Sequence, residues 1–363
     1  MVFRRMSKGM ISELLVTVLL VAAGAGTGLT IFADTMSPQS NLANLSLSQN
    51  GTAKVGAGGT SSQGLLGTAT QSGTEISTSG TDPADSTVTV RKTTDLDLLF
   101  LADLSYGNWD HLNGDTIAQL AALPAKDNPL DTRPTLHAVV INLPSPQQDL
   151  QQEGNWQVID WENAVSTTGF YGVAFQNVKT HEIVIAFRGS SNPQDYMYDL
   201  STIALHMSAD GGSQLSQARA LVTRVLTDHP GAKVLLTGHS LGGWLAERVA
   251  LDLHEHSLPI RVPYTFLGAA TFNAPGFQKG NYVSNQEWEN NLKGRYDGLI
   301  TNYAITEDVI GDWETPLGSP RIFMTYSGHF GSALNPLATH RIENFFYTPY
   351  FEHLSQLEFG APS

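Results

Sequence analysis

The 363-residue sequence contains no cysteine, so it has no disulfide framework, no thiolate metal site and no thiol nucleophile. It is also poor in basic residues, because 20 Lys and Arg stand against 34 Asp and Glu and give a net charge of −14. A nucleic-acid partner needs a basic face to neutralise phosphates, so this class of partner is excluded. The same balance argues against a polybasic protein of the membrane surface. The hydrophobic fraction of 41% is ordinary for a globular chain.

The first long hydrophobic run lies at the N-terminus. A basic stretch ends at Lys8, and an apolar run from Ile11 to Phe32 is long enough to cross a bilayer. Three interpretations stay open: a secretory signal cut near Ala33, an uncleaved anchor, or a leader of the prepilin type cut after Gly9. The segment around Gly9 resembles type IV pilin-like leaders, although Glu13 falls one place earlier than in the usual bacterial pattern. All three interpretations predict an extracellular or surface-tethered protein.

The next segment, from Asp34 to about Arg91, consists mainly of Ser, Thr, Gly, Asn and Gln. Such a composition cannot bury enough apolar surface to offset the entropy of ordering, so we expect a disordered stalk. Thr87–Val90 alternates and is a candidate for one short strand. The chain therefore divides into an apolar leader or membrane-spanning helix at 1–33, a low-complexity linker at 34–92 and a folded domain at 93–363.

The pattern of the folded domain alternates between strands and helices. A first helix is expected over 95–106, whereas residues 110–165 are expected to be irregular because five prolines interrupt them. Two strands, Tyr171–Phe175 and Glu182–Phe187, flank a polar turn. Further helices are predicted at 213–228 and Leu241–Leu253, and further strands at Lys233–Thr237, Tyr264–Ala269, Leu299–Ile305 and Arg321–Tyr326. Strands that alternate with helices predict an α/β fold with a mostly parallel central sheet.

One junction between a predicted strand and a predicted helix contains a candidate nucleophile, Ser240, within Gly238–Gly243. A serine on such a sharp turn needs small neighbours, and Gly238 and Gly242 supply them. The turn lifts the hydroxyl out of the sheet, and the helix N-terminus behind it favours developing negative charge. The alternative interpretation is a glycine-rich turn with an incidental serine. His239 occupies the variable place of this turn and is expected to be structural.

A serine hydroxyl is a poor nucleophile without a base, so a histidine and an orienting acid are expected downstream, in the order Ser, Asp, His. Asp308 lies just past the strand Leu299–Ile305 and is the predicted acid. The alternatives are three other acids near this strand: Asp312, Asp297 and Glu307. His340 is the predicted base, with His329 as its main rival.

An oxyanion hole needs two donors close to the nucleophile. The backbone N–H of Leu241, directly after Ser240, is expected to be one of them. The second is expected from Ser190, which follows the end of the strand Glu182–Phe187. Asp195 and Asp199 either support this loop or serve in helix capping and solvation.

These pieces together resemble the class 3 lipases and their bacterial lipase-like or phospholipase A1-like relatives. The residues that carry the resemblance are Ala186–Ser190, Asp195, Asp199, Gly238–Gly243, Asn273–Gly276, Asp308, Val309 and His340. The resemblance covers about 170–345 and implies an α/β-hydrolase fold. It also implies a Ser240–His340–Asp308 triad and an oxyanion hole formed by Ser190 and Leu241. The chain departs from the fungal members because it lacks disulfides, has Tyr196 in place of a Trp, and shows no short lid helix between 187 and 213.

The sequence therefore predicts a serine hydrolase that cleaves carboxylic esters of lipids, either triacylglycerol or phospholipid, through an acyl-enzyme. Its expected partner is the lipid or ester substrate, and its N-terminal helix offers a membrane contact. This chemistry requires no metal and no organic cofactor. The alternative is a pilin-like structural or adhesive subunit that displays a lipase-like module, with or without catalytic activity. The oligomeric state and the preferred ester stay open.

Overall fold

The computed structural model describes residues 92–112, 114–122, 154–190, 209–308, 310–326 and 339–359. All of these belong to one of the two units into which the chain divides, Thr89–Ser363. The predicted N-terminal helix, the linker up to residue 91 and the strand considered at Thr87–Val90 lie outside the described residues. Among the helices that are described, none is both long and apolar enough to cross a membrane.

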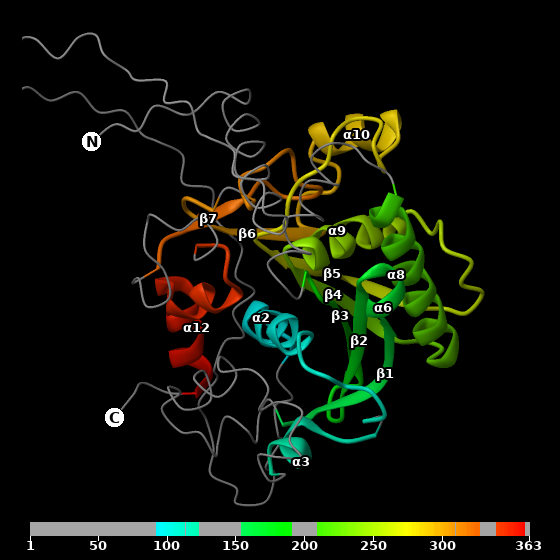
Figure 1. The fold of residues 1–363 in the computed structure, drawn as a ribbon, viewed down its shortest axis with the longest axis vertical. Helices are drawn as coiled ribbons and strands as arrows, with labels where there is room; N and C mark the ends of the chain where they lie inside the picture. Colours follow the sequence, from blue (N-terminus) through cyan, green and yellow to red (C-terminus); the bar gives the residue numbers. More distant parts are fainter. Residues whose placement is uncertain are drawn as a thin grey trace, which may run out of the picture. The chain divides into compact units, whose positions relative to one another are not determined.

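A seven-stranded sheet lies at the centre of the unit, and its strands follow one another in chain order (Figure 1). The pairings of β1 with β2 and of β2 with β3 are antiparallel, and all pairings from β3 to β7 are parallel. The strands are β1 (Trp156–Ala164), β2 (Phe170–Asn177), β3 (Glu182–Phe187), β4 (Lys233–His239), β5 (Thr265–Phe272), β6 (Ile300–Ile305) and β7 (Ile322–Met324). The predicted mostly parallel sheet is confirmed.

β1 shows that the expectation of irregular structure over 110–165 was wrong for the described part of this range, from which residues 123–153 are excluded. The short helix α3 (Ile117–Ala121) and the whole of β1 fall in this range. β1 is an edge strand with many half-exposed residues, and its Asp160 and Glu162 form ion pairs with Arg224 of helix α8. An edge strand that carries acids has little of the hydrophobic pattern that marks a buried strand, so the sequence pattern did not reveal it.

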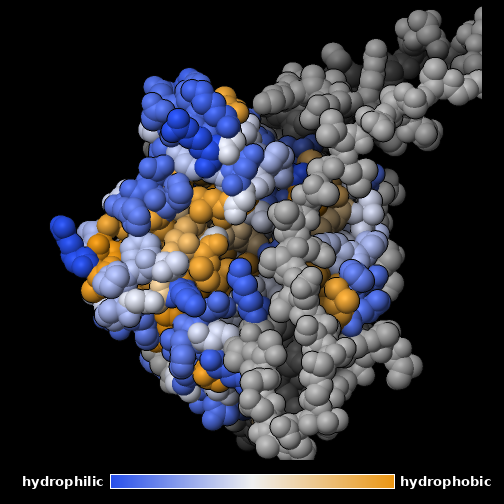
Figure 2. Space-filling view, turned by 180° about the vertical axis from the view of Figure 1, so that it is seen from behind, coloured by the Kyte–Doolittle hydropathy of each residue, from blue (hydrophilic) through white to orange (hydrophobic). Residues whose placement is uncertain are grey.

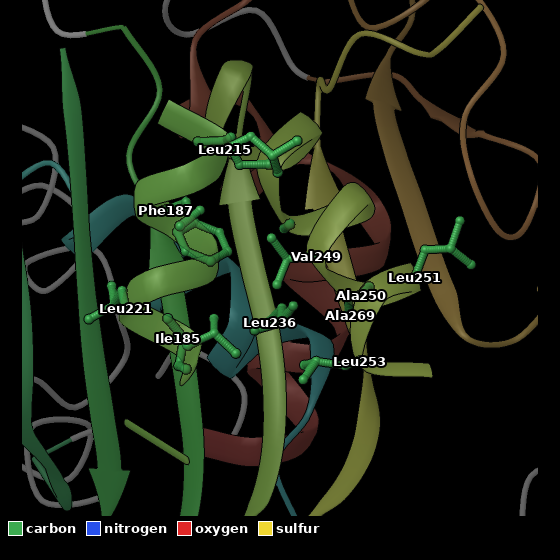
Figure 3. Close-up of a cluster of buried hydrophobic side chains, with 14 of the residues drawn as sticks. Ile185, Phe187, Leu215, Leu221, Leu236, Val249, Ala250, Leu251, Leu253 and Ala269 are labelled. Carbon is green, nitrogen blue, oxygen red and sulfur yellow. The ribbon is translucent and has the colours of Figure 1, made fainter. Parts of the chain in front are cut away.

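Helices cover both faces of the sheet, and each face has its own hydrophobic core. On one face lie α8 (Ala209–Asp228) and α9 (Leu241–His254), whose side chains meet those of β3, β4 and β5 (Figure 3). Typical members of this core are Leu221, Val249, Ile185, Leu236 and Ala269. On the other face lie α2 (Asp95–Leu104), the 3₁₀ helix η3 (Ile342–Tyr347) and α12 (Pro349–Phe359). Because both faces are covered, β3 is buried along its whole length.

The helix α2 confirms the first predicted helix and ends two residues before the expected position. A capping box starts it, in which the Thr94 hydroxyl accepts from Asp97 N and the Asp97 carboxylate accepts from Thr94 N. Every residue from Leu96 to Leu104 is buried, as expected for a helix that is largely apolar all round. Its C-terminal end brings Tyr106 to the end of β4, where the candidate nucleophile lies.

Two short helices, α6 (Val165–Thr168) and α10 (Asn285–Leu292), complete the described elements. The sequence of α10 is rich in amide and acidic side chains, and a capping box of Ser284 and Glu287 starts it. Seen from behind, its end of the molecule is mainly hydrophilic (Figure 2). α10 is therefore a solvated surface helix that contributes little to the core.

Candidate functional site

The turn between β4 and α9 holds Ser240 in an unusual backbone conformation. Its φ is 58° and its ψ is −129°, a region that L residues rarely adopt and that stores strain. Ser240 N donates to Phe272 O of β5 at 2.9 Å, which fixes the turn to the sheet. The side chain of Ser240 thus lies at the carboxyl end of the parallel strands, at the N-terminus of α9.

The glycines around Ser240 are required by close backbone contacts. A Cβ on Gly242 would collide with the carbonyl oxygen of Phe187 at the end of β3. A Cβ on Gly238 would collide with the backbone of Gly242. The predicted need for small residues on both sides of the serine therefore has a physical cause, which is the close packing of the backbones of β3, β4 and α9.

The loop that follows β3 lies against the candidate nucleophile. A Cβ on Gly189 would be 3.1 Å from Ser240 Cβ and 2.7 Å from His239 O, so the two backbones pass close together. Ser190 follows Gly189 directly, and Leu241 is the first residue of α9. The first amides of a helix have no partner within the helix and favour an anion. The predicted oxyanion-hole residues thus lie on the two segments that flank Ser240. Asp195, Asp199 and Tyr196, and the interval considered for a lid helix at 191–208, lie outside the described residues.

Asp308 and His340 are in direct contact. His340 Nδ1 lies 2.8 Å from Asp308 Oδ2, and the two residues are 5% and 0% exposed. The same carboxylate accepts from Gly311 N at 2.9 Å and from Ile310 N at 3.3 Å. A carboxylate held by backbone N–H groups accepts the proton of Nδ1, so a neutral His340 presents its Nε2 lone pair as a base.

The other acids considered near β6 do not reach this histidine. Asp297, Glu307 and Asp312 are all exposed, whereas Asp308 is buried at the turn after β6. Among the described candidates, therefore, only Asp308 pairs with His340. The rival base His329 lies outside the described residues.

His239 links the serine turn to the histidine. Its Nε2 lies 2.7 Å from the backbone oxygen of His340, and the centroids of the two imidazole rings are 4.8 Å apart. Its Nδ1 lies 2.7 Å from the hydroxyl of Tyr106. Ser240 is thus the chain neighbour of a residue that contacts His340. Neither Tyr106 nor this bridge was foreseen from the sequence, because Tyr106 and His239 lie 133 residues apart in the chain.

A second unforeseen residue, Arg321, organises the loop that carries Asp308. Its guanidinium donates to the backbone oxygens of Glu314 at 2.6 Å, Trp313 at 2.8 Å and Ala274 at 3.3 Å. Burial lowers the pKa of Arg321, and the nearby carboxylates, Glu247 first among them, oppose this effect. The side chain thereby ties the connection between β6 and β7 to the segment after β5.

Glu247 is a fully buried acid on α9, two turns beyond the candidate nucleophile. Burial raises its pKa from 4.5 to about 8. Its Oε2 accepts from Leu317 N at 2.8 Å, and its Oε1 lies 3.4 Å from the hydroxyl of Thr271. That hydroxyl has one proton and donates it to Asn302 Oδ1 at 2.7 Å, so a neutral Glu247 completes the chain by donating to Thr271. The described residues contain no group of three or more His, Asp or Glu that could hold a metal ion.

Comparison with known proteins shows that this chain is similar to lipases and phospholipases. The family model for the Tle-like phospholipase domain matches residues 144–339, more than half of the chain. A lipase of Rhizomucor miehei is 30% identical over 138 residues, which cover 34% of this chain and 37% of that lipase. An uncharacterised protein of Rickettsia prowazekii is 27% identical over 172 residues, 45% of this chain and 41% of that protein. The chain thus spans about two-fifths of the length of these relatives.

Solved lipase structures also match. The Rhizomucor miehei lipase propeptide complex has a TM-score of 0.40 at 16% identity, covering 74% of this chain and 82% of that one. The Lip2 lipase from Yarrowia lipolytica has a TM-score of 0.41 at 13% identity, covering 66% and 80%.

Proposed function

Because the chain belongs to the family of Tle-like phospholipase domains, we propose that it is a serine hydrolase that cleaves carboxylic esters of lipids. The catalytic residues are Ser240, His340 and Asp308. The observation that carries this proposal is the 2.8 Å hydrogen bond between two buried side chains, Asp308 and His340, beside the strained turn of Ser240. Strained backbone and a buried acid–imidazole pair are both typical of a catalytic centre.

In the proposed reaction the Ser240 hydroxyl attacks the ester carbonyl, and His340 Nε2 takes its proton. The proton then passes to the leaving alcohol, and a tetrahedral intermediate collapses to an acyl-enzyme. Asp308 keeps the proton of the imidazole on Nδ1 and stabilises the imidazolium. The N–H groups of Leu241 and Ser190 stabilise the oxyanion. In the second half of the reaction, water attacks the acyl-enzyme while His340 takes the proton of the water. His340 then gives that proton to the oxygen of Ser240 as the acid is released.

The first substrates to compare are a diacyl glycerophospholipid in vesicles and a triacylglycerol emulsion. The family description favours the phospholipid, since it names a phospholipase. We also propose that the folded domain acts outside the cytoplasm or tethered to the cell surface, which the basic stretch and apolar run of the first 33 residues support. Accessibility of the domain to added protease on intact cells tests this location.

Covalent labelling with a fluorophosphonate tests the catalytic serine directly. The wild type should be labelled at Ser240, and Ser240→Ala should lose both the label and about 10⁴- to 10⁶-fold of ester hydrolysis with an unchanged fold. Ser257→Ala is the matched control, since Ser257 is an exposed serine whose hydroxyl donates to Asp252 near the C-terminal end of α9, at the opposite end from Ser240. A Ser240→Ala protein with activity within tenfold of the wild type would place the nucleophile elsewhere.

The identity of the base is tested by comparing two histidines. His340→Ala should be as damaging as Ser240→Ala, and the double variant should lose little more, because triad members act as a unit. His329→Ala should lose far less. The opposite ranking would transfer the role of base to His329.

A further inference from the structure

The backbone oxygen of His340 is held by two buried side chains from neighbouring strand ends. His239 Nε2 lies 2.7 Å from it, and Asn273 Nδ2 donates to it at 3.3 Å. His239 ends β4, and Asn273 follows β5 in a left-handed conformation with a φ of 49°. The shorter distance identifies His239 as the stronger of the two donors.

This attachment matters because His340 is not part of a strand. It precedes η3, so its position depends on the contacts of its backbone and of its ring. The bond to Asp308 fixes the ring at Nδ1, but the position of the whole residue depends on its backbone contacts. A displacement of about 1 Å in a catalytic group can cost about 100-fold in rate.

The chemistry of the bridge places a proton on Nε2 of His239. A carbonyl oxygen only accepts, so Nε2 of His239 must carry a proton. A neutral ring then has its lone pair on Nδ1, where the Tyr106 hydroxyl, 2.7 Å away, donates to it. A charged His239 would repel the imidazolium that forms on His340 during catalysis, since the ring centroids are 4.8 Å apart. The neutral Nε2–H tautomer avoids this repulsion.

We propose that His239 is a positioning residue for the catalytic base. It is the chain neighbour of Ser240, so one strand end carries both the nucleophile and the donor that holds the base. The neutral Nε2–H tautomer of His239, fixed by Tyr106, keeps the backbone of His340 at the correct distance from the serine turn. This inference rests on the proposed function, because it needs His340 to act as the base.

Two amide substitutions that differ by one methylene group test the reach of this donor. The amide nitrogen of Gln extends about as far as an imidazole Nε2, whereas that of Asn ends near the place of Nδ1. His239→Asn should lower kcat on a soluble short-chain ester, and the rate of fluorophosphonate labelling, by about 100-fold at an unchanged KM. His239→Gln should recover kcat to within about tenfold of the wild type.

The matched control is Thr237→Val on the same strand. The buried Thr237 hydroxyl lies 2.9 Å from Leu98 O and 3.0 Å from Ala270 O, away from His340. This variant should lower the Tm, yet keep kcat within about twofold, because it disturbs β4 without touching the base. A loss of kcat in Thr237→Val equal to that in His239→Asn would overturn the positioning role.

A measurement on the full-length wild type keeps the inference testable even where His239→Asn does not fold. Nitrogen-15 NMR of protein labelled at histidine, assigned by the signals missing in His239→Gln, should show His239 neutral with its proton on Nε2. A proton on Nδ1 alone overturns the inference, as does a folded His239→Asn protein with wild-type kcat, or a folded His239→Gln protein that fails to recover activity. A wild type that resists the fluorophosphonate refutes the proposed function and this inference with it. A wild type that is labelled no faster than His239→Asn refutes the inference alone.

Discussion

Replacing Glu247 with Gln isolates the effect of one buried acid on the stability of the fold. The amide of Gln can donate to Thr271 while its oxygen accepts from Leu317 N, so the variant imitates the neutral carboxyl group at every pH. The wild-type side chain must ionise inside the core once the pH passes its pKa of about 8. The difference in the free energy of unfolding between the two proteins therefore reports the cost of that buried charge.

The sign follows from the direction of the pKa shift. Below pH 4.5 both the folded and the unfolded wild type are protonated at Glu247, and the stabilising effect of the neutral group is fully present. Between pH 4.5 and about 8 the unfolded chain releases its proton while the folded protein keeps it, so the free energy of unfolding falls as the pH rises. At about 1.4 kcal/mol per pH unit, the full loss is about 5 kcal/mol, complete above the folded pKa.

Urea unfolding between pH 6 and pH 9 is the suitable assay. The isoelectric point is near 5.1, and proteins associate where their net charge vanishes, so lower pH values are avoided. Over this range the wild type should lose about 2.7 kcal/mol relative to Glu247→Gln, with equal m-values for the two proteins. Parallel stability curves would refute the argument. Such curves would show that Glu247 is already ionised in the folded protein at pH 6, as in the unfolded chain.

Three further outcomes are expected. Asp308→Asn should lower kcat by about 10⁴-fold with little change in Tm, because the amide keeps the shape of the side chain but favours the wrong imidazole tautomer. An assay with a short-chain ester measures kcat, and a thermal melt measures Tm. Activity within tenfold of the wild type would refute the role of the acid. Gly242→Ala pushes a methyl group against Phe187 O, so it should lower the free energy of unfolding by several kcal/mol or prevent folding. Urea unfolding measures this, and an unchanged midpoint would contradict it. A chain that begins at Lys92 should hydrolyse a soluble ester within about twofold of the full-length rate, since residues 34–91 have the composition of a solvated linker; an insoluble or inactive product would make that segment part of the fold.

The parts of the fold that sequence reasoning predicted are those with a strong local pattern. The elements from Phe170 to Phe187 and from Lys233 to His254 are short-range features in which buried apolar residues recur at strand or helix spacing, and they lie where predicted. The Gly238 requirement is also local, since a Cβ there would collide with Gly242 of the same turn, whereas Gly242 is required by its contact with Phe187 of β3 as well. The resemblance to lipases and phospholipase-like relatives is confirmed by the family match, and the mostly parallel α/β sheet that it implies is confirmed by the structure.

The parts that sequence reasoning missed depend on contacts that their own local pattern does not show. β1 is a strand because its backbone pairs with β2 and its acids pair with Arg224, and neither fact is visible in its own pattern. The order of Ser, Asp and His along the chain could be predicted. The sequence offered several acids and histidines for the pair, and the contact of Asp308 with His340 is visible only in the structure. The catalytic roles of these residues stay a prediction. Tyr106 and Arg321 gave no signal in the sequence. Tyr106 acts through His239, which is 133 residues away, and Arg321 binds backbone oxygens, which no sequence pattern marks.

The connection from β6 to β7 shows how these long-range contacts serve one purpose. It carries Asp308, and its described part is fastened at three points: Trp313 O accepts from Gly276 N, Leu317 N donates to Glu247, and Arg321 binds the carbonyl oxygens near Trp313. One of these anchors lies on α9, the helix that begins directly after Ser240. Another lies on the segment after β5, which also holds the backbone of His340. The acid is therefore positioned relative to the nucleophile through shared supports rather than through its own strand alone. Since Glu247→Gln retains both hydrogen bonds of this anchor, it should change the pH dependence of stability while leaving ester hydrolysis close to the wild-type rate.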